Sequence, residues 1–385
     1  MTKTTKGLEI AEKIYRDRGQ RVKELKAEGK KIVGYFCPFT PVEMISAAGL
    51  VPYRITGSMI EPITQADSYL ETIACPFTRS ALDLALKGDY SFLDGYVIPH
   101  ACDNIVKLYD LWVHNIKHTY AHFINVPHTL SSASLDFFEA ELNTFKRSLE
   151  RFVEHEITNQ ELVRSIELQN EQRSLVRRLY QFRKKAPPSV SGVEVTKVLI
   201  AAMSLPTTEA NDMLQRVISE VNSRGDGQGN KKATRLMICG TGNENTTFIE
   251  VVEGSGAQVV VDDLCFGTKP YWYDVPTSGN PIGSIARSYL EKVNCPRTYR
   301  QSPGDHQSDL ENRFGYIYEL AREFQVKGVI LFILRYCDTW AFDAPDVKEY
   351  LEGKGLPVLH IEEEYPIGSD ARLKTRVEAF LEMLP

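Results

Sequence analysis

The segment KKIVGYFCPFTPVEMISAAGLVPYRI (residues 30–55) decides the expected fold. Ile32–Phe36 predicts a strand, a Cys-Pro loop follows, a helix begins at about Pro41, and Leu50–Ile55 predicts a second strand. The segment LDGYVIPHACDNIVKLYDLWVHNI (93–116) repeats the order strand, loop, helix. This alternation predicts a parallel sheet with helices on both of its faces.

A second series of the same kind follows a long charged segment. Residues 134–185 have a helical period and lack Gly and Pro, whereas TRLMICGTGNENTTFIEVVEGSGAQVVVDDLC (234–265) again alternates strand and helix. The loop SRGDGQGNKK (223–232) separates the two regions. The sequence therefore predicts an α/β fold of two doubly wound (Rossmann or flavodoxin-like) parallel-sheet domains.

Four divisions of the chain are expected. Residues 7–29 carry apolar side chains at helical spacing among alternating charges and end at Gly29, which predicts one amphipathic N-terminal helix. The expected bounds are 1–30 for the N-terminal helix, 31–133 for the first α/β domain, 134–230 for a helical connecting segment and 231–385 for the second α/β domain.

Composition narrows the class of protein. The formal charge of −6 over 385 residues lacks the basic excess of a nucleic-acid-binding protein. The longest apolar runs, such as Gly328–Leu334, are far shorter than the roughly 20 residues that cross a bilayer. The first 20 residues have no apolar stretch of the signal-peptide type. We therefore expect a cytoplasmic protein with neither nucleic acid nor membrane as a partner.

The positions of the seven cysteines are the main functional signal. In a reducing compartment they are expected to be thiols, metal ligands or buried fillers rather than disulfides. Cys75 opens a predicted helix and Cys295 lies in a loop, and the others come at or just after predicted strand ends: Cys37, Cys102, Cys239, Cys265 and Cys337. Because ligands of open α/β sheets bind outside the carboxyl ends of the strands, these thiols can converge on a cleft between the domains.

The local sequence around the cysteines favours metal binding. Three of the seven cysteines precede proline, whereas 19 prolines in 385 residues give about 0.3 such pairs by chance. No Cys-x₂₋₄-Cys pair of the zinc type occurs, since the closest cysteines, Cys239 and Cys265, are 26 positions apart. Widely spaced thiols suit a preformed iron–sulfur cluster, with scattered structural or redox thiols and zinc as the alternatives.

Other chemical signals are weak. The sequence Cys239-Gly-Thr-Gly lacks the third glycine of a dinucleotide fingerprint, and no Walker-type phosphate loop is present. His100 lies two residues before a cysteine, but a plain loop histidine is the more common case. Glu43 and Glu244 follow strand ends and could serve as acid or base, although carboxylates at helix N-termini need no catalytic reason. No catalytic residue, and no general acid, is assigned.

Taken together, the motifs resemble those of the 2-hydroxyacyl-CoA dehydratase and benzoyl-CoA reductase superfamily. The resemblance covers nearly the whole chain. It is carried by GYFCPFTPVEMISAAGLVPYRI (34–55), DSYLETIACPFTRSALDLAL (67–86), LDGYVIPHACDNI (93–105), VVDDLCFG (260–267), IARSYLEKVNCP (285–296) and GVILFILRYCDTWAFDAPDVKEYLEGKGLPVLHIEEEY (328–365).

The resemblance implies a metal centre and its ligands. Subunits of this superfamily hold a [4Fe–4S] cluster between two α/β domains, and the three matching ligands are Cys75, Cys102 and Cys337. The additional thiols resemble those of the superfamily's double-cubane proteins, homodimers with an [8Fe–9S] centre in each subunit. Six ligands are then expected, with Cys239 as the spare thiol, a role that could be exchanged with Cys37 or Cys295: Cys37, Cys75, Cys102, Cys265, Cys295 and Cys337.

The resemblance also implies partners and a reaction. A separate ATP-hydrolysing iron–sulfur activator would deliver low-potential electrons to this centre, which would reduce a small molecule. The alternatives are a subunit of a single-cubane [4Fe–4S] 2-hydroxyacyl-CoA dehydratase or aromatic-CoA reductase, which is a heterodimer, and a non-catalytic electron-transfer or cluster-carrier protein.

Overall fold

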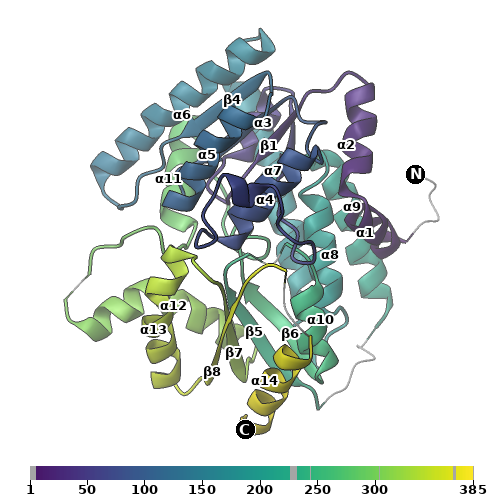
Figure 1. The fold of residues 1–385 in the computed structure, drawn as a ribbon, viewed down its shortest axis with the longest axis vertical. Coiled ribbons are helices and arrows are strands. Elements are labelled where there is room, and N and C mark those ends of the chain that lie inside the picture. The colour runs from purple at the N-terminus through teal and green to yellow at the C-terminus, as the bar shows by residue number, and fades with distance from the viewer. Residues whose placement is uncertain (1–5, 226–231, 243, 303, 367–369, 385) are drawn as a thin grey trace.

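Two separate four-stranded parallel sheets organise the chain (Figure 1). The structure is a computed structural model that describes residues 6–225, 232–242, 244–302, 304–366 and 370–384. The first sheet has the order β2-β1-β3-β4 and consists of β1 (Ile32–Tyr35), β2 (Val51–Arg54), β3 (Gly95–Pro99) and β4 (Tyr120–Ile124). The second has the order β6-β5-β7-β8 and consists of β5 (Thr234–Gly240), β6 (Ala257–Asp263), β7 (Gly328–Leu334) and β8 (Val358–Glu363).

The two sheets share one topology. In each, the first strand pairs with the second on one side and with the third on the other, so the chain reverses its direction of winding between them. Ile32 is in register with Val51, and Leu236 with Gly328. This arrangement confirms the predicted fold class of two doubly wound parallel-sheet domains. The residue bounds of the domains remain a prediction.

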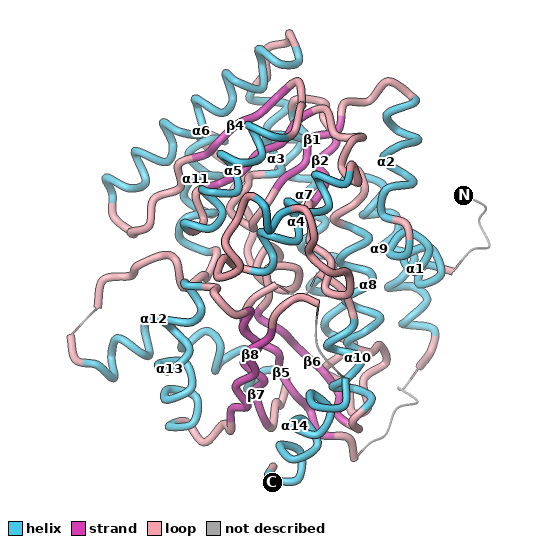
Figure 2. The backbone as a smooth tube through the Cα atoms, viewed as in Figure 1, coloured by secondary structure: helices cyan, strands magenta, loops and turns pink. Residues whose placement is uncertain are grey.

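Helices cover both faces of each sheet (Figure 2). The first sheet packs against α3, α6, α7 and α11 on one face and α2, α4 and α5 on the other, and the second packs against α1, α8, α9, α12 and α13 on one face and α10 and α14 on the other. Their bounds are α1 Gly7–Arg16, α2 Arg18–Ala27, α3 Val42–Ala47, α4 Pro76–Lys87, α5 Asp103–Asn115, α6 Ser132–Val153, α7 Asn159–Gln181, α8 Gly192–Ala202, α9 Thr207–Ser223, α10 Thr247–Gly254, α11 Pro281–Lys292, α12 His306–Glu323, α13 Asp338–Gly353 and α14 Asp370–Met383, with a 3₁₀ turn η1 at Ala66–Ser68.

Helix α11 connects the two halves. It follows β6 of the second sheet in sequence, yet Ile282, Ile285 and Leu290 are buried in the core of the first sheet. Figure 1 shows α11 beside α6, and the two helices contact each other. The chain therefore crosses from the second sheet to the first and back again before β7 begins.

The single N-terminal helix predicted over residues 7–29 is wrong in one respect. Two helices, α1 and α2, meet at Asp17, whose backbone leaves the helical region with φ −134° and ψ 80°. The Asp17 side chain accepts a hydrogen bond from the backbone N–H of Gln20 and so caps the start of α2. The apolar period continues through this break, which is why the sequence pattern concealed it.

Two further segments differ in detail from the sequence pattern. The charged stretch 134–185 contains two helices, because Thr158 and Glu161 form a capping box that starts α7 anew. Most of the predicted boundary loop, residues 226–231, lies outside the described part of the chain. Among the described residues, no helix combines the length and the apolar character needed to cross a membrane.

We expect Gly240→Ala to destabilise the protein strongly. Gly240 ends β5 with φ +136°, and a Cβ there would lie 1.9 Å from the carbonyl oxygen of Phe332 in β7. Because backbone atoms cannot rotate away, the free energy of unfolding should fall by about 3 kcal/mol or more. Urea denaturation followed by circular dichroism measures this change.

Gly256→Ala is the matched control. Gly256 also has a positive φ of +94°, but a Cβ would meet no atom within 4 Å. Its cost should be only the conformational one, about 1 to 2 kcal/mol. Equal losses in the two variants would show that the close approach of β5 and β7 is unimportant.

Candidate functional site

One cavity takes its lining from the carboxyl ends of strands in both sheets. It has a volume of about 110 Å³. Arg54 ends β2, Leu334 ends β7, and Thr241 directly follows β5. The two topological switch points thus open on a common space, and Figure 2 shows the loops gathered between the two groups of strands.

Six of the seven cysteines line this cavity. They are Cys37, Cys75, Cys102, Cys265, Cys295 and Cys337. The remaining walls are largely apolar and include Phe77, Ile105, Phe266 and Trp340. No histidine, aspartate or glutamate of the described residues contributes to the lining. The structure therefore brings together all six thiols that the sequence singled out.

Three of these thiols stand at helix N-termini. Cys75, Cys102 and Cys337 are the N-cap residues of α4, α5 and α13, and none of the three side chains caps its own helix. We call them the helix-cap trio. The unpaired N–H groups and the helix dipole favour negative charge at such positions, so each thiol has a local reason to lose its proton to a metal.

The other three thiols come from irregular segments, and we call them the loop trio. Cys37 follows β1 with a left-handed φ of 55°, and its carbonyl accepts a hydrogen bond from the Thr40 N–H. Cys265 follows β6, and Cys295 follows α11, with its carbonyl accepting from the Thr298 N–H. Tight turns therefore hold the loop trio at the cavity.

The thiols of each trio influence one another. In the helix-cap trio, a contact with Cys75 and burial raise the pKa of Cys337 well above its ordinary value, and burial and then Cys337 raise the pKa of Cys102 to about 12. In the loop trio, burial and then Cys295 raise the pKa of Cys37 to about 11. Burial, Cys37 and Cys295 likewise raise the pKa of Cys265. Burial and neighbouring thiols therefore favour the protonated forms of Cys37, Cys102 and Cys265.

Three buried cations favour the ionised forms of the loop-trio thiols. Arg54 favours the ionised forms of Cys37 and Cys265, and Lys269 favours those of Cys265 and Cys295. Arg297, which is 5% exposed, donates only to backbone carbonyls, those of Ala101, Val126 and Pro127, and to the Thr298 hydroxyl. Neither Arg54 nor Arg297 forms an ion pair with a carboxylate in the described part of the chain. Their charge is therefore available to thiolates.

Sequence reasoning did not identify these cations. Arg54 is the penultimate residue of the predicted strand Leu50–Ile55, and Arg297 stands two residues after Cys295, so both occupy strand-end and loop positions like those of the cysteines. Lys269 lies four residues after Cys265, and its Nζ is 2.5 Å from Asp263 Oδ2. Their positions close to cysteines in the sequence could have indicated these cations.

Cys239 lies apart from the cavity. It is fully buried in β5, and its Sγ is 3.6 Å from Asp263 Oδ2. The same carboxylate accepts hydrogen bonds from Lys269 and from the Tyr316 hydroxyl. Cys239 therefore belongs to a polar network inside the second sheet.

The spacing of the cavity thiols is relevant to the kind of metal they could hold. Within the described ranges, no three side chains of His, Cys, Asp or Glu converge as ligands of one metal ion. The six sulfur atoms instead surround a larger space. Six thiols among largely apolar walls provide the sulfur donors that iron–sulfur clusters prefer.

The three polar candidates have different surroundings. Glu43 is completely buried, 2.6 Å from Arg173 Nη2, and accepts from the Tyr289 hydroxyl at 2.6 Å, which indicates a structural pair. His100 packs against the ring of His128, and burial lowers its pKa. Neither residue lines the cavity.

Glu244 is the exception among these polar residues. Its Oε1 accepts a hydrogen bond from the Tyr365 hydroxyl, whereas its buried Oε2 has no partner among the described residues. Burial raises the pKa of Glu244 to about 6, and Tyr365, Arg18 and Arg54 oppose that rise. A Cβ on Gly242, which lines the cavity, would lie 3.2 Å from Glu244 Oε2. The carboxyl therefore stands directly behind the cavity wall.

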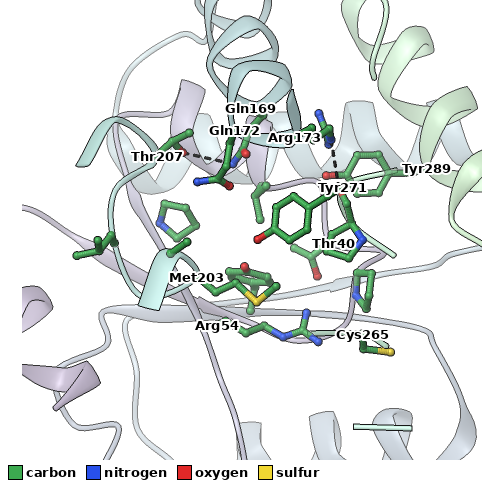
Figure 3. A pocket seen from close by; sticks show the side chains of 17 residues that line it. Thr40, Arg54, Gln169, Gln172, Arg173, Met203, Thr207, Cys265, Tyr271 and Tyr289 are labelled. Atoms are coloured by element: carbon green, nitrogen blue, oxygen red, sulfur yellow. Dashed lines mark hydrogen bonds between the residues drawn. The ribbon is translucent and has the colours of Figure 1, made fainter. Parts of the chain in front are cut away.

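A smaller cavity adjoins the first (Figure 3). Its volume is about 50 Å³. Both cavities share Pro38, Arg54 and Cys265 in their linings. The small cavity adds polar groups that the thiol cavity lacks, including Gln172 and Tyr271.

Comparison with known proteins gives consistent results. The (R)-phenyllactyl-CoA dehydratase beta subunit of Clostridium sporogenes is 24% identical over 368 residues, which is 94% of both chains. The beta subunit of lactoyl-CoA dehydratase of Anaerotignum propionicum is 23% identical over 363 residues, again 94% of both chains. A benzoyl-CoA reductase chain of Thauera aromatica is 27% identical over 337 residues, or 86% of this chain and 84% of the relative.

The family assignment rests on a separate comparison. The sequence model of the family described as 2-hydroxyglutaryl-CoA dehydratase, D-component, matches residues 37–384. This range contains all seven cysteines and every strand of the two sheets except β1. The chain therefore belongs to the 2-hydroxyglutaryl-CoA dehydratase D-component family.

Proposed function

We propose that this protein is an iron–sulfur reductase component whose six cavity cysteines hold an [8Fe–9S] double-cubane centre. The observation that carries the proposal is that six thiols line one cavity, three of them at helix N-termini and three in irregular segments. Three sulfur ligands for each cubane account for both trios, and the position of Cys239 away from the cavity accounts for the seventh thiol. When bound, such a centre supplies one-electron reduction at low potential.

Charged and apolar groups of the protein suit the cavity to an iron–sulfur centre. Helix N-termini adjoin the helix-cap trio, and the positive charges of Arg54, Lys269 and Arg297 favour thiolates in the loop trio. Apolar walls such as Phe77 and Phe266 exclude water. Exclusion of water and fixed hydrogen bonds are the means by which a protein tunes the reduction potential of a cluster.

We propose a separate ATP-hydrolysing iron–sulfur activator as the electron source. The sequence contains no Walker-type phosphate loop, which fits a division of labour between two proteins. Several relatives are named as subunits, so multi-component systems occur among them. The proposed assembly is a cytoplasmic homodimer that reduces a small molecule. We expect it to work under anaerobic conditions.

A second candidate function is favoured by the names of the relatives. Several are beta subunits of 2-hydroxyacyl-CoA dehydratases. On that reading the helix-cap trio alone would hold one [4Fe–4S] cluster, and the chain would be one subunit of a heterodimer. A third candidate is a non-catalytic electron-transfer or cluster-carrier protein. An assay with activator, ATP and candidate substrates would distinguish it from both enzymes, because a carrier would show no turnover.

Glu244 is the proton source that we propose for the reduction. Its carboxyl is buried, Oε2 has no partner among the described residues, and it lies behind Gly242 of the thiol cavity. The Tyr365 hydroxyl holds Oε1 and fixes the direction of the carboxyl. A carboxyl that is protonated near neutral pH can donate a proton where an electron arrives.

Iron and sulfide quantification tests the centre. We expect about eight irons per chain in anaerobically purified protein, from two four-iron units. About four irons would favour the dehydratase reading. None after anaerobic purification would contradict both.

Single cysteine variants test which trio binds iron. Cys75→Ala, Cys102→Ala and Cys337→Ala should each lower the iron content by at least about half and abolish the native electron paramagnetic resonance signal. The same loss of iron and of the resonance signal is expected in the loop-trio variants, because the proposed centre needs both trios: Cys37→Ala, Cys265→Ala and Cys295→Ala.

Cys239→Ala is the matched control for these variants. It removes a buried thiol of the same chemistry that does not line the cavity, so iron content should be unchanged. If all three loop-trio variants kept the iron content of the unmodified protein, the helix-cap trio alone would hold a single cubane. Iron loss in Cys239→Ala would mean that the spare thiol is misassigned.

Glu244→Gln should change the pH dependence of stability. The folded-state pKa of about 6 exceeds the ordinary value of 4.5, so the stabilising effect of the proton is complete below pH 4.5 and is lost as pH rises through 6. The unmodified protein should therefore lose roughly 2 kcal/mol of unfolding free energy between pH 4.5 and pH 8, and the neutral variant should not. Urea denaturation at several pH values measures this difference. The exposed Glu382→Gln should show the same loss as the unmodified protein.

A further inference from the structure

We propose that the small cavity beside the thiol cavity binds a small planar oxyanion, such as a short carboxylate, on the Arg54 guanidinium. The inference deepens the proposed function, because it rests on that function for the role of the anion as substrate and names its chemical class. The binding itself can be measured whether or not the cluster assignment holds.

Arg54 is a buried cation that forms no ion pair with a carboxylate in the described part of the chain. The residue is 3% exposed, and its Nε has no hydrogen-bond acceptor among the described residues. Within the same residues no ion pair includes Arg54, whereas the buried Arg173 in the neighbouring wall pairs with Glu43 at 2.6 Å. A buried guanidinium that donates no hydrogen bond to a carboxylate is costly, so an anion that accepts from its N–H groups would be bound favourably.

Aromatic rings hold the guanidinium in place. Its central carbon lies 4.7 Å from the centre of the Phe266 ring and 5.4 Å from that of the Tyr35 ring. Contacts of this kind occupy the faces of the guanidinium and leave the in-plane N–H groups for hydrogen bonding. A planar anion with two oxygens matches that fork of donors.

The small cavity offers further hydrogen-bond donors and, among the described residues, no carboxylate. Figure 3 shows Gln172, Tyr271 and Arg54 around the same space, with the Tyr271 hydroxyl directed into it. Burial raises the pKa of Tyr271 far above its ordinary value, so this hydroxyl keeps its proton and can donate it in a hydrogen bond. No aspartate or glutamate of the described chain lines the cavity.

Volume limits the size of the ligand. The cavity of about 50 Å³ compares with the roughly 10 to 15 Å³ that one water needs on the same measure, so it holds about four waters. A ligand of about three or four non-hydrogen atoms fits, as formate and acetate do. An intact coenzyme A ester is far too large to be enclosed there.

The location connects the anion to the proposed redox centre. Cys265 and Arg54 line both cavities, and Figure 3 shows the Cys265 side chain on the same side of the small cavity as the Arg54 guanidinium. An anion on Arg54 would therefore lie next to a thiol of the loop trio. Proximity of this kind is what electron transfer to a bound substrate requires.

Isothermal titration calorimetry of the anaerobically purified full chain tests the site with sodium acetate. We expect saturable binding of one acetate per chain, at least tenfold weaker binding of the neutral isostere acetamide, and no competition by the larger benzoate. Arg54→Gln should weaken acetate binding at least tenfold, since it removes a charge-assisted hydrogen bond. Equal affinity for acetate and acetamide, or unchanged affinity in Arg54→Gln, would overturn the proposal.

Two further variants separate a ligand site from a general effect of charge. Tyr271→Phe removes one hydroxyl from the small cavity and leaves the thiol cavity intact, so it should weaken acetate binding at least threefold without changing the iron content. Arg16→Gln removes the same charge as Arg54→Gln from an exposed site and should leave acetate binding unchanged. An effect of Arg16→Gln as large as that of Arg54→Gln would overturn the proposal.

Iron content separates the failure of this inference from the failure of the proposed function. Acetate binding that requires Arg54 and Tyr271 in a protein without iron would support the site and refute the cluster. Full iron content with no Arg54-dependent acetate binding would support the cluster and refute the site. Unchanged acetate affinity in Tyr271→Phe, with iron lost only in Arg54→Gln, would make Arg54 a counter-charge for the cluster and would refute the anion site.

Discussion

Six ionisable sulfur atoms line one largely apolar cavity, and the rest of the molecule is arranged around that constraint. Burial and mutual proximity raise the pKa of most of these thiols, so the cavity is electrostatically satisfied either with every thiol protonated or with compensating positive charge present. The protein provides part of that charge itself, through helix N-termini on one side and buried cations on the other. A metal centre would provide the remainder and release the protons.

The sheet topology explains how residues so distant in sequence meet. Each sheet reverses its winding direction beside its first strand, and the loops at such a point separate to leave a crevice. In the first sheet that crevice receives Cys37 and Cys102, and in the second it receives Cys337. Because the carboxyl ends of both sheets border one cavity, ligands from the two halves of the chain become neighbours.

Much of this arrangement could be predicted from the sequence. The strand–helix alternation indicated the fold class, and the strand-end position of the cysteines indicated a shared site, because both depend on local patterns and on a general rule for parallel sheets. The break at Asp17 was not predicted, since a side-chain cap interrupts a helix without disturbing its apolar period. Arg54 and Arg297 were not predicted either, because an arginine that lacks a carboxylate partner is recognisable only in three dimensions.

Helix α11 has a consequence for how any large inorganic group reaches the interior. The segment leaves the second sheet, seats Ile282, Ile285 and Leu290 in the core of the first, and then carries Cys295 to the cavity. Separation of the two halves would expose these side chains to water. Each large aliphatic side chain exposed would cost about 1.5 to 3 kcal/mol of free energy. On the proposed function, a preformed cluster that entered by a hinge-like opening of the folded protein would face this cost, whereas insertion during the final stage of folding would not.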